Sequence, residues 1–190
     1  AAGGNLFKVR LGDRLAHKRR RNTLAGSRRN IQAHYDMGND FYALWLDPGM
    51  TYSSALFDGK DLSLETAQRA KYARTLELAG VADEETILEI GCGWGGMAEH
   101  SALAGKTVEG ITLSGRQLEF ARERLKQQDL DGRVSLALRD YRQLQGQYDA
   151  IVSIEMIEAV GEENWPAYFA TLSRLLKPGK QAVIQAITIA

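Results

Sequence analysis

The sequence has 190 residues, of which 44% are hydrophobic and 25% charged, a composition that fits one globular domain with its own core. Lysine and arginine together number 24, as do aspartate and glutamate, and Cys92 is the single cysteine. This cysteine usage excludes an internal disulfide and favours a reducing, cytoplasmic compartment. No apolar run approaches the about 20 residues that cross a bilayer, so neither a membrane span nor a signal peptide is expected.

The basic residues are concentrated near the start of the chain. Nine lysines and arginines lie between Lys8 and Arg29, where Asp13 is the one acidic residue. We therefore predict a basic arm over residues 1–30 and one folded domain over residues 31–190.

Three apolar residues of this arm, Phe7, Leu11 and Leu15, have the spacing of a short amphipathic helix. An anionic lipid surface would attract such an arm by about 1 kcal/mol per cation, and a solvated linker or the tail of a further domain is the alternative. Nucleic acid is not expected as a partner, because the aromatic side chains that stack on bases are nearly absent from the arm.

Residues 38–57 are expected to hold a short helix and a loop. Asn39 or Asp40 can cap a helix whose Phe41, Leu44 and Trp45 share one face. The sequence D-P-G at 47–49 then ends the helix with a turn. Residues 51–57 show no period and are expected to form a loop.

A longer helix is predicted from residue 64 to about residue 79. Ser63 can cap its start, and Gly80 can end it in a left-handed conformation. Its packing surface is expected to consist of Ala67, Ala70, Ala73, Leu76 and Leu78.

From residue 86 onward, strand and helix patterns alternate, which is typical of βαβ units and a parallel sheet. Strands are expected at 86–90, 107–112, 133–138, 149–154 and 181–189, helices at 95–103, 114–128 and 164–176, and a turn at Pro178-Gly179. The fold class is therefore α/β, a Rossmann-like, mostly parallel sheet with helices on both faces. The last strand is so apolar that it should be buried on both faces, which favours further strands beyond the C-terminal edge over a natural edge strand.

A glycine-rich turn follows the first predicted strand and points to a nucleotide-type ligand. Gly91, Gly93 and Gly96 match the dinucleotide pattern G-x-G-x-x-G. Glu89 lies two residues before Gly91, and its carboxylate would repel a pyrophosphate, whereas it suits a ligand with an ammonium and a sulfonium. We therefore predict S-adenosylmethionine as the ligand, with Glu89, Gly91 and Gly93 beside it. A dinucleotide and a purely structural turn are the alternatives.

Metal catalysis is not expected. The chain has three histidines and one cysteine, and none of the spacings that mark a zinc site is present.

Seven stretches together carry a resemblance to a known family. They are H-Y-D (34–36), D-P-x-x-T-Y-S (47–53), L-E-I-G-C-G-W-G-G (88–96), T-L-S-x-x-Q (112–117), D-Y-R (140–142), S-I-E-M-I-E-A-V-G (153–161) and L-K-P-G (176–179). In this collinear order they resemble the cyclopropane-fatty-acyl-phospholipid synthases, a family that includes the mycolic acid cyclopropane synthases. The resemblance implies a methyltransferase fold, S-adenosylmethionine as methyl donor and a cis-unsaturated acyl chain as substrate.

The resemblance also implies positions for the donor. The methionine end would be held by Tyr52, Ser53, Gly91 and Gly93, the ribose side by Thr112, Leu113 and Gln117, and the adenine by Asp140 and Tyr141. The acyl chain would come from a membrane phospholipid or a carrier, which implies peripheral association of a cytoplasmic protein with an anionic membrane. A homodimer is left open.

Members of this family are thought to use a bound bicarbonate that takes a proton from the transferred methyl group, and Glu158 looks like the residue that anchors it. This chain departs from the family at two positions associated with the anion. Ser54 replaces a cysteine and Gln185 replaces a histidine. These changes argue against bicarbonate binding and ring closure, so a methyl-branched product is kept beside a cyclopropane. We name Glu158, Ser54 and Gln185 as the candidate catalytic residues.

Two other functions are kept as alternatives. One is a small-molecule amine N-methyltransferase, in which Glu158 would serve as the base. The other is a domain that binds the donor without catalysing transfer.

Overall fold

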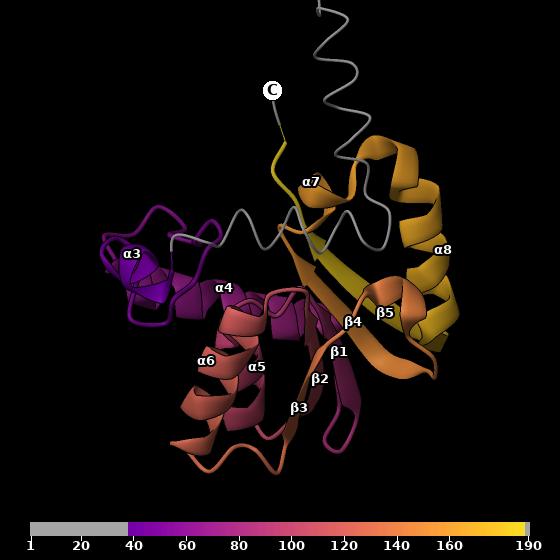
Figure 1. Ribbon diagram of the computed structural model, residues 1–190, viewed down its shortest axis with the longest axis horizontal. Coiled ribbons are helices and arrows are strands. Elements are labelled where there is room, and N and C mark those ends of the chain that lie inside the picture. Colours follow the sequence, from indigo (N-terminus) through magenta and orange to yellow (C-terminus); the bar gives the residue numbers. More distant parts are fainter. Residues whose placement is uncertain (1–37, 189–190) are drawn as a thin grey trace, which may run out of the picture.

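The computed structural model describes residues 38–188, which form one parallel sheet between two layers of helices (Figure 1). The strands run in the order β3-β2-β1-β4-β5, and every neighbouring pair is parallel. They are β1 (Thr86–Ile90), β2 (Thr107–Thr112), β3 (Val134–Leu138), β4 (Tyr148–Ile154) and β5 (Leu176–Gln185). The chain runs from β1 out to β3 and then returns to β4, so the strand order switches between β1 and β4, where such sheets bind ligands.

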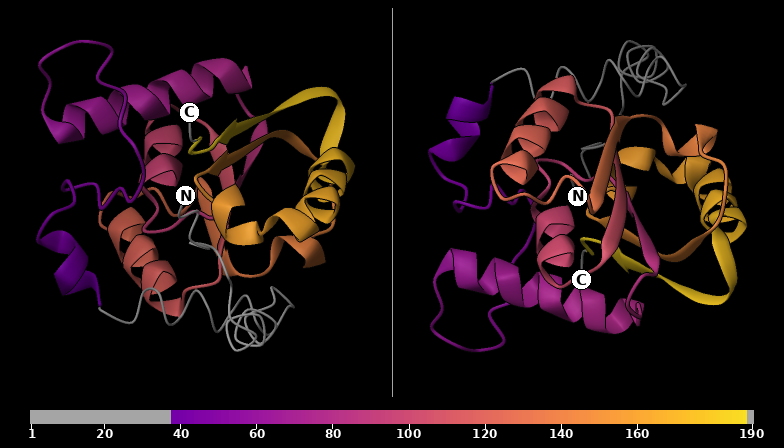
Figure 2. Two further views of the ribbon diagram at one scale, coloured as in Figure 1. Left: turned by 90° about the horizontal axis from the view of Figure 1, so that it is seen from above. Right: turned by 90° about the horizontal axis from the view of Figure 1, so that it is seen from below.

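The helices divide between the two faces of the sheet, as the two views in Figure 2 show. One face is covered by α4 (Leu64–Ala79), α5 (Gly96–Leu103) and α6 (Gly115–Lys126), and the other by α7 (Ile157–Val160), α8 (Trp165–Leu175) and the short 3-10 helix η1 (Tyr141–Gln143). A second 3-10 helix, η2 (Glu162–Asn164), leads into α8, and α3 (Asn39–Ala43) precedes the long loop before α4. The predicted basic arm lies outside the described residues. Each helix within residues 38–188 is too short or too polar to cross a lipid bilayer.

Strand β1 separates two hydrophobic cores. Ile87 packs in the core beneath α4, α5 and α6, whereas Leu88 and Ile90 pack in the core beneath α8. Because side chains alternate along a strand, Glu89 points to the same side as Ile87. The Glu89 carboxylate is thereby directed at α4 and α5.

The first four strands begin and end within one residue of the predicted positions, and the predicted caps of α4 are confirmed. The hydroxyl of Ser63 accepts a hydrogen bond from the Thr66 backbone N–H, and Gly80 has the left-handed conformation, φ +59°. These elements follow local signals, namely apolar runs, capping side chains and glycines.

The prediction for the last strand was wrong in its bounds. β5 begins at Leu176 and ends at Gln185, so Pro178 and Gly179 lie within it and not in a preceding turn. Tyr148 pairs with Leu176 and Ala150 with Gln181, which leaves residues 177–180 as a bulge opposite one β4 residue. A bulge tolerates a proline, which has no N–H to donate to the ladder. Among the described strands β5 pairs with β4 alone, and its residues are half-buried or exposed, so burial on both faces is not found there.

The predicted packing surface of α4 was also partly wrong. Ala73 and Leu78 are exposed, whereas the buried positions include three polar side chains, Gln68, Lys71 and Thr75. α4 lies over the loop of residues 51–54, and its buried groups bond to that loop. Gln68 Nε2 donates to the Ser53 carbonyl (2.7 Å), and Tyr72 Oη donates to Thr51 Oγ1 (3.0 Å). The buried face is polar because the surface beneath it is polar.

Removing the cap of α4 should lower stability measurably. Ser63→Ala deletes the acceptor for the Thr66 N–H, and we expect the free energy of unfolding to fall by about 1 kcal/mol in urea denaturation. Ser173→Ala, which removes an exposed hydroxyl within α8, is the matched control and should change stability by less than about 0.5 kcal/mol. Equal effects of the two substitutions would contradict the capping role.

Candidate functional site

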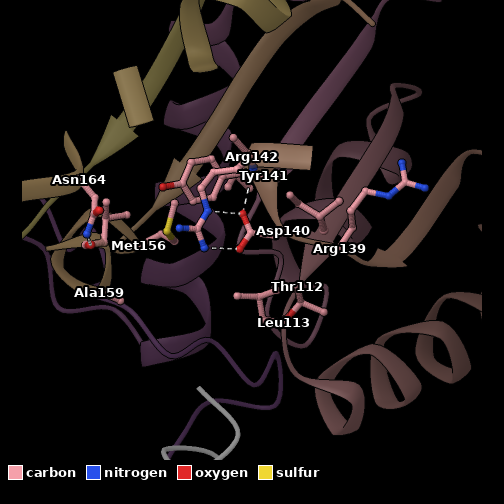
Figure 3. A pocket seen from close by; sticks show the side chains of 13 residues that line it. Thr112, Leu113, Arg139, Asp140, Tyr141, Arg142, Met156, Ala159 and Asn164 are labelled. Carbon is pink, nitrogen blue, oxygen red and sulfur yellow. Dashed lines mark hydrogen bonds and ion pairs between the residues drawn. The ribbon is translucent and has the colours of Figure 1, made fainter. Parts of the chain in front are cut away.

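A pocket opens at the carboxyl ends of the strands, beside the switch in strand order (Figure 3). It contains about 500 Å³ of empty space, part of it open to solvent. Its walls are mainly apolar, and a few polar groups converge on it, as in sites that bind small molecules and cofactors. Five of the predicted donor-binding residues line this pocket: Gly91, Thr112, Leu113, Asp140 and Tyr141.

The glycine-rich turn is bonded to the neighbouring strand. The N–H groups of Gly91 and Cys92 both donate to the Ile111 carbonyl at 2.9 Å, and the Gly95 N–H donates to the Cys92 carbonyl at 2.8 Å. These bonds fix the turn against the carboxyl end of β2. Gly91 has φ +86°, and a Cβ there would lie 3.1 Å from Cγ of Met156, so glycine keeps the pocket floor clear.

Asp140 and Tyr141 are fixed in the pocket wall. The Asp140 carboxylate accepts hydrogen bonds from Arg142 Nε (2.8 Å), Arg142 Nη2 (2.6 Å) and the Arg142 backbone N–H (3.0 Å), as Figure 3 shows for the side chains. The Tyr141 ring packs edge-on against Tyr168, with 5.4 Å between the ring centroids. The sequence reasoning did not name Arg142 as a site residue. Its place two residues after an aspartate at a strand end could have indicated that it pairs with Asp140.

Thr112 and Gln117 form a second polar contact near the turn. Thr112 Oγ1 donates to Gln117 Oε1 (3.1 Å), and Ser114, which caps α6, accepts from the Gln117 backbone N–H (3.3 Å). Gln117 is buried, and its Nε2 atom lies 4.0 Å from where a Cβ on Gly93 would be. Gln117 and Gly93 are therefore neighbours beside the pocket and not part of its lining.

Glu89 carries a buried carboxylate with an unused acceptor. Its side chain is 4% exposed, and its Oε2 atom accepts no hydrogen bond from the described residues. Burial raises the pKa of Glu89 to about 8, while the charge of Lys71 and the Ala98 backbone N–H act in the opposite direction. A buried oxygen of this kind is costly unless it meets a donor or a cation. The ammonium and sulfonium of S-adenosylmethionine fit this acceptor, whereas a pyrophosphate does not.

Lys71 is a functional candidate that the sequence reasoning missed. It is 5% exposed, and its Nζ atom donates to Ser53 Oγ at 2.6 Å. Burial lowers the pKa of Lys71 to about 8, against the charges of Glu155, Asp47 and Glu89, which raise it. The signal in the sequence was its place four residues after Ala67, on the buried stripe of α4.

The loop that carries Tyr52 and Ser53 lies against α3. The Tyr52 ring is 43% exposed and lies 5.5 Å from the rings of Tyr42 and Trp45. Trp94 is buried beneath it, 5.0 Å from the Tyr42 ring, and its Nε1 atom donates to Asn39 Oδ1 (2.8 Å). Trp45, Tyr52 and Phe41 together form an exposed surface, here called the aromatic rim.

Two of the predicted catalytic residues meet at a third that was not predicted. Glu155, directly after β4, accepts hydrogen bonds on its Oε1 atom from the Ser54 backbone N–H (2.8 Å) and from Gln185 Nε2 (2.8 Å). Glu158 lies one helical turn further on, where it is exposed and accepts from the Ile187 backbone N–H (2.5 Å). The place of Glu155 at the carboxyl end of an apolar strand was the signal that sequence reasoning passed over.

Comparison with known proteins adds to this geometry. A family model described as mycolic acid cyclopropane synthetase matches residues 22–190. The chain is 46% identical over 172 residues to the tuberculostearic acid methyltransferase UfaA1 of Mycobacterium tuberculosis, covering 86% of this chain and 40% of the relative. It is 43% identical over 146 residues to the cyclopropane-fatty-acyl-phospholipid synthase of Escherichia coli, covering 76% of this chain and 37% of the relative. The chain thus spans less than half the length of these curated relatives.

Among solved structures, mycolic acid cyclopropane synthase CmaA1, complexed with SAH (S-adenosylhomocysteine) and CTAB, matches with a TM-score of 0.78 and 34% identity. The match covers 83% of this chain and 55% of that one. The sheet and its two helical layers are therefore those of a Rossmann-like methyltransferase.

Proposed function

Because the chain belongs to the mycolic acid cyclopropane synthetase family of S-adenosylmethionine-dependent methyltransferases, we propose that it transfers a one-carbon unit from S-adenosylmethionine to the cis double bond of a fatty acyl chain in a phospholipid. The observation that carries this proposal is the buried Glu89 carboxylate, whose Oε2 atom has no partner among the described residues. It lies on β1, the strand that also supplies the pocket residue Ile90 and leads into Gly91. A cationic donor would supply the missing charge.

When bound, S-adenosylmethionine supplies an electrophilic methyl group on a positively charged sulfur. The side chain of Glu89 would balance its positive charge, and the apolar wall would hold its adenosine. Lys71 fixes Ser53, so the loop that carries Tyr52 is held against α4. The residues proposed to hold the donor are Tyr52, Ser53, Glu89, Gly91, Gly93, Thr112, Leu113, Gln117, Asp140 and Tyr141.

The acceptor is proposed to be lipid because of what surrounds the loop. An isolated alkene is a poor nucleophile, so its reaction depends on alignment and on exclusion of water. The aromatic rim exposes Phe41, Trp45 and Tyr52 by 40%, 48% and 43%. Exposed apolar surfaces of this kind mark binding sites for apolar partners. The names of the two curated relatives, a tuberculostearic acid methyltransferase and a cyclopropane-fatty-acyl-phospholipid synthase, support the same substrate class.

We also propose that the protein acts at a membrane surface. The nine basic residues between Lys8 and Arg29 support peripheral binding to an anionic membrane surface from the cytoplasm. Binding of this kind weakens as salt screens the charges. Vesicle flotation with anionic and with zwitterionic lipid, at low and high salt, tests this part of the proposal separately from catalysis.

The test of the reaction uses the protein at its natural length. It is incubated with methyl-labelled S-adenosylmethionine and vesicles of mono-unsaturated phosphatidylglycerol, and the released acyl chains are analysed by mass. We expect label in the chains with a gain of one CH₂ unit, and none with vesicles of saturated phosphatidylglycerol. Donor binding by calorimetry without label in any unsaturated lipid would contradict the proposal, and label in a small amine would establish the alternative.

A further inference from the structure

Glu155 occupies a backbone conformation that non-glycine residues rarely adopt. It has φ +47° and follows directly after β4, at the carboxyl edge of the sheet. The left-handed conformation is unfavourable for a residue with a Cβ and persists where the surroundings enforce it. The Glu155 backbone N–H donates to the Gln185 carbonyl at 2.9 Å, which fixes this conformation. A carboxylate is therefore held here at a cost to the fold.

Two donors from distant parts of the chain converge on one oxygen of this carboxylate. The Ser54 backbone N–H, 101 residues away in sequence, and Gln185 Nε2, 30 residues away, both bond to Oε1 at 2.8 Å. Gln185 Nε2 also reaches the Ser54 carbonyl at 3.3 Å, so loop and strand are joined at this point. No described residue donates to Oε2, which leaves that oxygen able to accept a proton.

A buried cation, Lys71, lies close enough to Glu155 to interact with it electrostatically. Lys71 bonds to Ser53, the neighbour of Ser54, and the charges of Lys71 and Glu155 attract each other. Glu155 is half-buried, so this attraction is screened less than it would be on an open surface. The carboxylate thus lies beside the loop that is proposed to hold the methionine end of the donor.

From this geometry we propose that Glu155 is the base that takes the proton lost by the acyl chain after methyl transfer, in place of a bound bicarbonate. The inference rests on the proposed function. Ser54 and Gln185 stand at the two positions that the family resemblance associates with the anion, and the Ser54 backbone N–H and Gln185 Nε2 are already bonded to the Glu155 side chain. Glu158 bonds to Ile187 instead and is more exposed.

The step balances without an added reagent. The π electrons of the acyl double bond form the new bond to the methyl carbon, and the methyl–sulfur bond breaks with its electron pair left on sulfur. The second alkene carbon is then a cation. Glu155 Oε2 accepts one proton, either from the transferred methyl or from a neighbouring chain carbon. The released C–H electron pair closes a cyclopropane in the first case or forms a new double bond in the second, and the carboxylic acid returns the proton to water.

The first test separates basicity from shape. Glu155→Gln keeps an acceptor oxygen for Ser54 and Gln185 but removes the base. We expect turnover on mono-unsaturated phosphatidylglycerol to fall at least about 100-fold, with the donor dissociation constant unchanged within about 2-fold. Glu162→Gln, which alters an exposed glutamate in η2, should leave both values unchanged. Full turnover of the Glu155→Gln variant, or an equal loss of donor affinity and turnover, would overturn the proposal.

The second test measures bicarbonate binding in the absence of S-adenosylmethionine. Binding of carbon-13 bicarbonate to the donor-free protein is followed by NMR for the natural protein and for Glu155→Gly, a substitution that suits the left-handed backbone. We expect that bicarbonate does not bind to the natural protein. We expect it to bind to Glu155→Gly, in which the Ser54 backbone N–H and Gln185 Nε2 no longer bond to a carboxylate. Turnover of the natural protein should persist in buffer freed of carbon dioxide. Bicarbonate binding by the natural protein, or turnover that requires added bicarbonate, would overturn the inference.

The two proposals fail in different ways. If no unsaturated lipid is methylated, the proposed function fails. Bicarbonate binding in the absence of S-adenosylmethionine still decides whether Glu155 fills an anion site. If lipid is methylated in a bicarbonate-dependent manner, the proposed function stands and the role of Glu155 is wrong.

Discussion

Between about pH 5 and about pH 8, the free energy of unfolding is expected to fall with pH by about 2–4 kcal/mol more in the natural protein than in a Glu89→Gln variant. Burial raises the pKa of Glu89 from its ordinary value to about 8. In this window the folded protein therefore retains a proton that the unfolded chain has lost. Raising the pH then favours the unfolded state, with a limiting slope of about 1.4 kcal/mol per pH unit.

Urea denaturation of both proteins across this range measures the difference. His100 has a pKa lowered mainly by burial, which gives a pH dependence of the opposite sign, but it is common to both proteins and cancels in the comparison. Glu109→Gln is the matched control. It makes the same chemical change on the neighbouring strand β2, at a carboxylate that accepts a hydrogen bond from Tyr148 Oη (2.8 Å). Parallel curves for the natural protein and Glu89→Gln would show that Glu89 is not a buried, protonated carboxyl.

The same proton links stability to donor binding. A cationic donor favours the charged form of Glu89, so its binding releases the proton. Affinity should therefore rise with pH by up to about tenfold per unit below about pH 7.5, where the donor's own amino group stays charged. Calorimetry in buffers of different ionisation enthalpy measures this proton release directly, and the Glu89→Gln variant should lack it.

The parts of the fold that sequence reasoning placed correctly depend on local chemistry. The apolar run before Gly91 predicts β1, and Ser63 and Gly80 predict the ends of α4. Both predictions succeed because a few adjacent residues determine the burial of a strand and the caps of a helix. Thr112, Leu113 and Asp140 meet Gly91 in one pocket because the carboxyl ends of parallel strands share one edge of the sheet. Topology alone brings them together.

The parts that could not be placed depend on contacts between distant segments. Ser54 and Glu155 are 101 residues apart, and nothing near either residue predicts that a backbone N–H of one bonds to the carboxylate of the other. Helical periodicity finds a buried face only where that face is apolar. α4 buries Gln68 and Lys71 against the polar loop of residues 51–54, so the apolar spacing of Ala73 and Leu78 indicated the wrong face.

Replacing Lys71 by methionine is expected to lower the free energy of unfolding by about 3 kcal/mol near neutral pH. The ammonium is buried, and its partners would remain behind without it. Ser53 Oγ would lose its 2.6 Å donor, and the carboxylates of Glu155 and Asp47 would lose the cation that attracts them. Chemical denaturation measures the loss. Arg74→Met on the same helix is the matched control, because Arg74 is exposed and pairs with Glu77 at the surface, where the expected change is less than about 0.5 kcal/mol.

A double-mutant cycle at about pH 8, where a fraction of Glu89 is ionised, decides whether the two buried groups act as one unit. Removing a single partner of a buried pair leaves an uncompensated charge, whereas removing both is often close to neutral. The Lys71→Met/Glu89→Gln protein should therefore be more stable than Lys71→Met alone, and the two effects should depart from additivity by at least about 1 kcal/mol. Additive effects would mean that Lys71 stabilises only the Ser53 loop. In that case Lys71→Met alone should weaken donor binding, and Glu89 should titrate as before.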